Sequence, residues 1–238
     1  MTVRALFPTY LFEYNLIEAG YVDDQYLDLL KSELDKMMDR DPMGRFVSNN
    51  GGWQSNDGCE SNPNFSRLNR AFNRITQQDL LKFFGLSPSD VQLPMGNCWA
   101  NINPPGTWNV PHCHNGCWYS GVFYIDAEED QGDLILISGD QKILSDFPSA
   151  TRSSPNARVV PQRGKLILFP SGAMHMVEPN QSERNRYSVA FNFDTQYLVR
   201  RKIGESYVSQ EEDPRGDEIF FELDPHGYPV YPNLEYFG

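Results

Sequence analysis

Between Pro111 and Tyr124 the chain reads PHCHNGCWYSGVFY, and this stretch decides how the remaining sequence is interpreted. It holds two of the protein's four histidines, His112 and His114, one residue apart. Side chains at positions i and i+2 of a β-strand point to the same face, so the two imidazoles are expected to lie side by side. Two such groups are able to bind one metal ion, but a His-x-His pattern also occurs as an ordinary pair of histidines.

Length, charge and cysteine content set the limits for the rest of the interpretation. A chain of 238 residues is long enough for one large β domain with a substantial core. The net charge of −12 argues against direct binding of nucleic acid. No apolar run is long enough to cross a membrane, and we find no signal peptide. The four cysteines do not form a dense disulfide framework, so we expect free thiols and a cytoplasmic location.

The first ninety residues carry two helical patterns. Leucines at helical spacing follow an acidic capping residue, and Gly85 is placed to end a second helix. Pro8 would keep a preceding strand at the edge of a sheet. We therefore expect a strand over 6–12, a helix from Asp23 or Asp24 to about Asp39, a loop over 41–64, and a helix from about Asn64 to Phe84.

From Val91 onward the pattern changes to short strands separated by Gly and Pro. Such spacing is typical of a sandwich or barrel and not of alternating βαβ units. The predicted fold class is mainly β with flanking helices, in a jelly-roll or cupin-like arrangement. The expected strands are 97–103, 108–114, 119–126, 134–137, 158–160, 165–169, 174–178 and 187–193, with a long loop over 140–156.

A third histidine follows the strand and tight turn of 164–172. In a β barrel this arrangement returns a side chain to a site opened earlier, so His175 is expected beside His112 and His114. A lone histidine on an apolar strand is more often a core residue. Its place after a His-x-His pattern favours a metal ligand.

The next strand carries Arg186, Ser188 and Asn192, which share one face by their even spacing. A buried arginine needs a partner, because an unpaired buried charge is very costly. A planar guanidinium holds a carboxylate with two parallel hydrogen bonds. The partner of Arg186 is therefore either an acidic residue of the protein or the carboxylate of a bound ligand.

The ordered set of these motifs resembles the 2-oxoglutarate/Fe(II)-dependent oxygenases of the prolyl-hydroxylase-like superfamily. The resemblance covers about residues 5–194 and leaves out the tail. Each motif alone is weak, and the specificity lies in their order. The matching pieces are LFPT at 6–9, WQS at 53–55, HCH at 112–114, SGVFY at 120–124, GKLILFPS at 164–171, HMV at 175–177 and RYSVAFN at 186–192.

The resemblance implies a double-stranded β-helix that uses Fe(II), 2-oxoglutarate and O₂. In it His112 and His175 match two metal ligands, while Arg186 and Ser188 match the pair that grips the distal carboxylate of 2-oxoglutarate. Tyr124 matches a tyrosine that often donates to the same carboxylate. The implied activity is that of a hydroxylase, which couples decarboxylation of 2-oxoglutarate to C–H oxidation of a small-molecule, peptide or protein substrate.

The departure from the family pattern is His114, because the wider superfamily has Asp or Glu there and binds iron through two histidines and one carboxylate. His114 is either a third ligand, or unbound with an acid elsewhere completing the site, or it stands where halogenating relatives leave a vacancy. A bulky imidazole fits the last reading poorly. We expect a three-histidine site.

Further alternatives stay open. The same histidines resemble a cupin, which has no use for 2-oxoglutarate, and Cys113 or Cys117 would belong to a structural zinc site. Asn101 and Asn192 either line the substrate pocket or are ordinary buried amides. We expect an oxygenase domain over 1–195, with its barrel at about 91–195, and an acidic extension over 196–238 that serves as a lid or as the arm of a homodimer.

Overall fold

The computed structural model describes residues 9–88, 91–139 and 156–194, together with the backbone of 196–197, 201–203 and 206–208. The chain divides into two compact units, Met1–Gln196 and Tyr197–Gly238. Strand β13 (Gln196–Tyr197) lies at their boundary, and the second unit holds the hairpin of β14 (Arg201–Ile203) and β15 (Ser206–Val208). The predicted loop over 140–156 lies outside the described residues except for Asn156, which begins strand β9 (Asn156–Val159) and does not belong to a loop. The lid or arm role of the tail and the segment 6–8 also lie outside the described residues.

The first helix confirms its capping prediction. Helix α1 (Asp24–Arg40) begins after Asp23, whose Oδ1 accepts a hydrogen bond from the Tyr26 N–H at 2.8 Å. This bond satisfies one of the free donors at the helix start. Leu27, Leu30 and Leu34 are fully buried, as their helical spacing predicts.

The second helical segment is also confirmed, with an irregularity inside it. It consists of a 3₁₀ turn η1 (Pro63–Phe65), α2 (Ser66–Ile75), a π-helical turn η2 (Thr76–Leu80) and α3 (Leu81–Phe83). The Thr76 hydroxyl donates to the Phe72 carbonyl at 2.8 Å within this irregular region. Gly85 then turns the chain at φ +68°, a conformation that glycine adopts without strain.

Two antiparallel sheets form the body of the first unit and confirm a mainly β fold. The larger runs in the order β1 (Phe12–Asn15), β10 (Lys165–Pro170), β7 (Tyr119–Asp126), β12 (Arg186–Phe193), β5 (Met95–Asn103) and β3 (Trp53–Gln54). The smaller runs in the order β2 (Asn49–Asn50), β6 (Trp108–His112), β11 (Met174–Val177), β8 (Leu134–Ile137) and β9 (Asn156–Val159). A short strand, β4 (Val91–Gln92), precedes β5.

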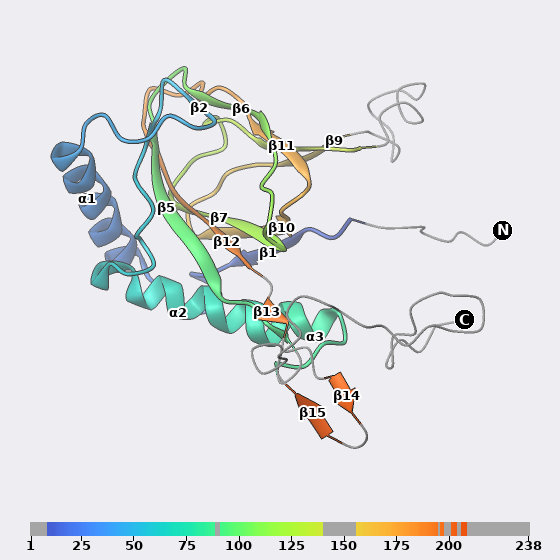
Figure 1. Ribbon diagram of the computed structural model, residues 1–238. Helices are drawn as coiled ribbons and strands as arrows, with labels where there is room; N and C mark the ends of the chain where they lie inside the picture. Colours follow the sequence, from blue (N-terminus) through green and yellow to red (C-terminus); the bar gives the residue numbers. More distant parts are fainter. Residues whose placement is uncertain are drawn as a thin grey trace. The chain divides into compact units, whose positions relative to one another are not determined.

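The larger sheet has a different hydrophobic cluster on each face. Helices α1 and α2 run along its outer face, on the side away from β6 and β11 (Figure 1). Phe123 belongs to the cluster on the helical side, where Phe72 of α2 stacks on Phe191 of β12 with ring centroids 4.1 Å apart. Its neighbour Tyr124 belongs to the second cluster, together with Leu134 of the smaller sheet. Alternate residues of the larger sheet therefore face the space between the two sheets.

Three predicted boundaries need correction. Within the described residues, the predicted opening strand begins only at Phe12 and runs to Asn15, because residues 9–11 are not in a strand and the pairing with β10 begins with Phe12 opposite Leu168. The strand predicted over 108–114 ends at His112, and Gly116 turns the chain at φ +80°. The predicted loop 41–64 contains the two-residue strands β2 and β3, which pair with β6 and β5.

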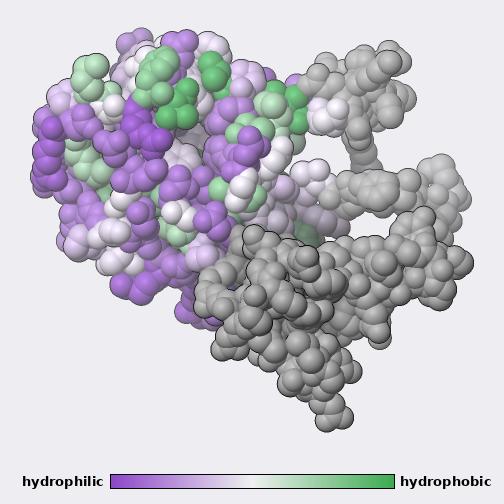
Figure 2. Space-filling model, viewed as in Figure 1, coloured by the Kyte–Doolittle hydropathy of each residue, from purple (hydrophilic) through white to green (hydrophobic). Residues whose placement is uncertain are grey.

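The surface and the cysteines agree with the composition. Most of the coloured face in Figure 2 is hydrophilic, in keeping with the net charge of −12. All four cysteines are free, and Cys59 and Cys98 are buried. Among the described residues we find no helix with the length and apolar character that a membrane span requires.

Candidate metal centre and anion pocket

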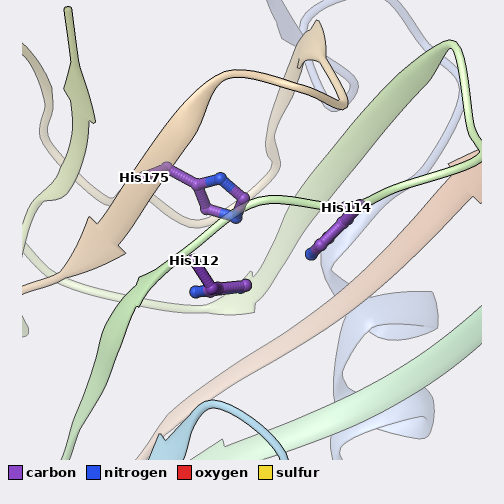
Figure 3. A group of neighbouring side chains, drawn as sticks. All are labelled: His112, His114 and His175. Carbon is purple, nitrogen blue, oxygen red and sulfur yellow. The ribbon is translucent and has the colours of Figure 1, made fainter. Parts of the chain in front are cut away.

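The three predicted histidines converge between the two sheets. His112 is the last residue of β6 and lies opposite His175 of β11 in the strand register. Their ring centroids are 4.2 Å apart, and that of His114 is 5.3 Å from His112 and 5.1 Å from His175. One ligand nitrogen of each ring lies within 4.8 Å of the other two. Figure 3 shows the three rings turned toward a common point.

His114 reaches this point by a different route from the one that the sequence predicts. It does not continue strand β6, which ends two residues earlier at His112. Its backbone N–H donates to the Ser171 carbonyl at 2.9 Å, in the turn that follows β10. A contact between distant segments, and not strand alternation, therefore places the His114 ring.

Each histidine has a hydrogen-bond partner at Nδ1. The His112 nitrogen lies 2.7 Å from the Val110 carbonyl, and the His175 nitrogen lies 2.9 Å from the Ala173 carbonyl. A carbonyl only accepts, so these two Nδ1 atoms carry the proton. The Nε2 lone pairs are then free for a metal, which binds neutral imidazole.

Burial keeps the three rings neutral. It lowers the pKa of His112 and of His114, and it lowers the pKa of His175 to about 3, with a further contribution from the positive charge that His112 would carry. A neutral cluster loses no proton when it binds a cation at neutral pH. The site is thus prepared for a metal ion.

No acidic side chain completes the cluster in the part of the chain that the structure describes, where the three histidines form the single group with metal-binding spacing. Cys113 and Cys117 do not belong to it either. Their sulfur atoms lie 3.9 Å and 3.8 Å from oxygens of Asn115. The chemistry of the cluster fits Fe(II), which imidazole nitrogens bind well.

Arg186 lies in the same space and is 2% exposed. Its Nη1 donates to the carbonyls of Gln131 and Gly132 at 2.5 Å and 3.1 Å. Its Nε has no partner, and no acidic residue within 9–88, 91–139 or 156–194 forms an ion pair with it. Burial lowers the pKa of Arg186, yet arginine stays charged in proteins. Among the described residues, this buried cation in the pocket therefore has no acidic partner.

Tyr124 and Ser188 line the same cavity as Arg186. Ser188 pairs with Tyr124 across the β12–β7 ladder and with Asn101 across the β12–β5 ladder. Burial raises the pKa of Tyr124 to about 12, so its hydroxyl keeps its proton over the whole working range of pH. Both hydroxyl groups therefore offer hydrogen-bond donors in the cavity that Arg186 also lines.

A single cavity of about 70 Å³ joins the histidines to the arginine. The predicted residues in its wall are His112, His114, His175, Arg186, Ser188, Tyr124 and Asn101. Asn192 does not line the cavity. It lies on the far side of His114, with its Oδ1 2.6 Å from the His114 Nδ1.

Several contributors were not anticipated from the sequence. Ser120 and Ser171 contact each other at 2.9 Å, and Ser120 also lies 2.8 Å from His114. Both serines occur in motifs that the sequence marks, SGVFY and FPS, but a motif gives no contact partner. Gln54 of β3 also lines the cavity, from the predicted loop.

Comparison with protein families identifies part of the chain. Residues 97–192, which contain both the His-x-His pattern and the strand of Arg186, match the model of the family described as "Putative 2OG-Fe(II) oxygenase". None of the curated proteins compared with the chain matches it significantly.

Solved structures share the fold at low identity. A Pseudomonas putida prolyl-4-hydroxylase is 18% identical with a TM-score of 0.50, over 77% of this chain and 91% of its own. HygX from Streptomyces hygroscopicus, solved with nickel and 2-oxoglutarate, is 13% identical with a TM-score of 0.53, over 84% and 92%. A Trichoplax adhaerens prolyl hydroxylase, in complex with a peptide, is 13% identical with a TM-score of 0.53, over 77% and 83%. These similarities confirm the predicted double-stranded β-helix.

Proposed function

We propose that this chain is a 2-oxoglutarate-dependent dioxygenase, because residues 97–192 match the model of the 2OG-Fe(II) oxygenase family, and we propose how its site is built. Three histidines hold the iron, namely His112, His114 and His175. At the other end of the cavity Arg186 holds the distal carboxylate of 2-oxoglutarate, with Ser188 and Tyr124 as further donors. This set departs from the two-histidine, one-carboxylate triad by having imidazole in all three places.

The observation that carries the proposal is the unpaired guanidinium in the cavity of the histidines. Two carbonyl groups occupy Nη1, while Nε lacks a partner among the described residues. A carboxylate that approaches this side of Arg186 would accept two parallel hydrogen bonds. It would also neutralise a charge that is costly to bury alone.

The charges of 2-oxoglutarate match those of the cavity. Three neutral histidines leave the iron with its full double charge, and Arg186 adds a second cationic centre. A dicarboxylate brings one negative group for each, so the metal and 2-oxoglutarate should bind cooperatively. When bound, iron and 2-oxoglutarate together supply the activation of O₂ and the oxidation of a substrate C–H bond.

The chain's own contribution is to hold these groups and keep bulk water away. Leu134, Phe169 and Val177 form apolar parts of the wall. Asn101 supplies a polar group in the same wall and is our candidate for substrate contact. We propose hydroxylation as the outcome.

The substrate class remains a proposal at the level of a small molecule or a peptide. Similar structures include one with hygromycin B bound and one with a peptide bound, so the fold accepts both kinds of ligand. The acidic composition does not favour nucleic acid. A cytoplasmic location and a homodimer remain predictions.

The proposal is tested by anaerobic calorimetric titration of 2-oxoglutarate into Fe(II)-loaded protein, followed by admission of O₂ and measurement of succinate. We expect saturable binding that needs the metal, and succinate only when all three components are present. A protein that binds Fe(II) but neither binds nor consumes 2-oxoglutarate would contradict it. That result would favour the cupin alternative, in which Arg186 has no ligand to hold.

A further inference from the structure

His114 is held differently from the other two histidines of the site. His112 and His175 contact the carbonyl two residues before them on their own chain segment. The His114 Nδ1 instead lies 2.6 Å from Asn192 Oδ1 and 2.8 Å from Ser120 Oγ. These partners come from β12 and β7, and they are 5% and 0% exposed. Strand β6 ends before His114, and the larger sheet therefore supplies the hydrogen-bond partners of the His114 Nδ1.

A chain of hydrogen bonds from Asp57 through Asn97 determines which end of the Asn192 amide faces His114. The Asp57 carboxylate only accepts, and Asn97 Nδ2 donates to its Oδ1 at 3.4 Å. The Asn97 Oδ1 is thereby turned toward Asn192, whose Nδ2 donates to it at 2.8 Å. The Asn192 Oδ1 must then face His114. An ion pair of 2.9 Å between Arg45 and Asp57 stabilises the charged end of the chain.

We propose that Asn192, oriented by Asn97 and Asp57, is a positioning residue that fixes His114 as the Nδ1–H tautomer and leaves its Nε2 free for the metal. The inference rests on the proposed metal site. An amide oxygen carries no hydrogen and can only accept a hydrogen bond, so it selects the tautomer in which the His114 Nδ1 is protonated. Partners of this kind orient a metal-binding histidine and set its tautomer.

Ser120 is a second acceptor for the same proton. Its hydroxyl has one proton to donate, either to Asn192 Oδ1 at 2.7 Å or to Ser171 Oγ at 2.9 Å. In both arrangements its oxygen is able to accept from His114 Nδ1. Removal of Asn192 alone therefore weakens the control of the tautomer, and removal of both partners abolishes it.

The tautomer is measured directly by ¹⁵N NMR of the metal-free protein with labelled histidine, because the two ring nitrogens give different signals in the two tautomers. We expect His114 to carry its proton on Nδ1 in the wild type and in Asn192→Asp, which keeps an acceptor. In the double variant Ser120→Ala, Asn192→Leu we expect substantial Nε2–H. An Nε2–H wild type, or a double variant with an unchanged tautomer, would overturn the inference.

Metal binding supplies the second readout. Anaerobic Fe(II) titration should give roughly 10- to 100-fold weaker binding for Asn192→Leu, the usual range for partners behind a metal ligand, and should be largely restored in Asn192→Asp. The matched control is Asn69→Leu. Asn69 is 8% exposed, and its Nδ2 donates to the carbonyls of Cys59 and Glu60 away from the cavity.

The control variant should lower the melting temperature and leave Fe(II) affinity unchanged. Equal losses of Fe(II) affinity in Asn69→Leu and Asn192→Leu would reduce Asn192 to an ordinary buried amide and contradict the inference. A wild type that has the Nδ1–H tautomer but binds no Fe(II) would instead contradict the proposed metal site. The two failures are therefore distinguishable.

Discussion

The two ends of the cavity are prepared in opposite ways. At the histidine end every Nδ1 has a partner within the protein, and burial keeps the rings neutral. At the arginine end a permanent cation is buried, with carbonyl groups on one nitrogen and no described partner on Nε. The described residues thus provide hydrogen-bond partners for every histidine Nδ1, but none for the Nε of Arg186.

This difference indicates how the ligands divide the site. The histidine end offers three lone pairs and no net charge, so it attracts a cation that needs nitrogen ligands. The arginine end offers charge and donors, so it attracts an anion with a planar carboxylate. A molecule with an anionic group at each end would link both. The predictions below test each end in turn.

The largest expected effect follows loss of a histidine ligand. His175→Ala should weaken Fe(II) binding by more than about 100-fold, because it removes one of the three proposed metal ligands. This loss exceeds the usual upper limit for mutating a residue that only hydrogen-bonds to a ligand. Anaerobic titration gives the affinity, and circular dichroism confirms that the fold is kept. Met174→Ala, the exposed neighbour on β11, is the control and should bind Fe(II) normally. Unchanged affinity in His175→Ala would exclude it as a ligand.

The next effect separates the arginine end from the metal. Arg186→Ala should reduce 2-oxoglutarate affinity by roughly 30-fold or more and leave Fe(II) affinity nearly intact, since a desolvated charge pair contributes about 2–5 kcal/mol. Arg186→Lys should restore part of the loss, because an ammonium group does not match both carboxylate oxygens.

The matched control for this prediction is Arg184→Ala. Arg184 lies just before β12, is exposed and forms an ion pair with Glu128. Its removal should not change 2-oxoglutarate binding. If both variants lose the same affinity, general electrostatic attraction explains the binding and the specific contact is wrong.

How much of this site was predictable depends on how local each interaction is. The Asp23 cap, the buried leucines of α1 and the opposite faces of Phe123 and Tyr124 follow from periodicity along the chain. The convergence of His112 and His175 follows from motifs that mark neighbouring strands. The fold class and the candidate metal ligands can therefore be predicted from the sequence.

The remaining features depend on contacts between distant segments. The place of His114 depends on the Ser171 carbonyl, and the role of Asn192 depends on the register that sets β12 between β5 and β7. The even spacing along the strand predicted that Asn192 lies on the inner face of the sheet. This spacing does not tell whether such a residue lines the cavity or hydrogen-bonds to a metal ligand from outside the cavity. Such distinctions come from three-dimensional packing and not from spacing.

The acid sensitivity of the metal-free protein tests the histidine end. The pKa of His175 in the folded protein is about 3, below its ordinary value, so between that value and about 6.5 the unfolded chain binds more protons. The free energy of unfolding should therefore fall as the pH decreases through this window and be fully retained above it.

The variant His175→Leu should have a flatter pH dependence, by up to about 1.4 kcal/mol per pH unit, because one titrating group is removed. Urea unfolding curves across the window measure the slope. Parallel slopes for the wild type and the variant would show that His175 is not buried as a neutral group.

The smallest effect belongs to a neutral donor at the arginine end. Ser188→Ala should weaken 2-oxoglutarate binding by about 1 kcal/mol, or roughly fivefold, the usual contribution of one neutral hydrogen bond. Calorimetry of the Fe(II)-loaded protein measures it. A loss as large as that of Arg186→Ala would mean that the hydroxyl, and not the guanidinium, dominates this end.

The central claim is that one dicarboxylate links the two ends. It is tested most directly by the melting temperature of Fe(II)-loaded protein under anaerobic conditions, with and without 2-oxoglutarate. At a ligand concentration about 100 times the dissociation constant, binding stabilises the folded state by about 2.7 kcal/mol, so the melting temperature should rise clearly. The stabilisation should fall to about 0.9 kcal/mol or less in Arg186→Ala, whose affinity is expected to be roughly 30-fold weaker or more, and it should be much reduced without metal. A wild-type melting temperature that does not respond to saturating 2-oxoglutarate would contradict the account.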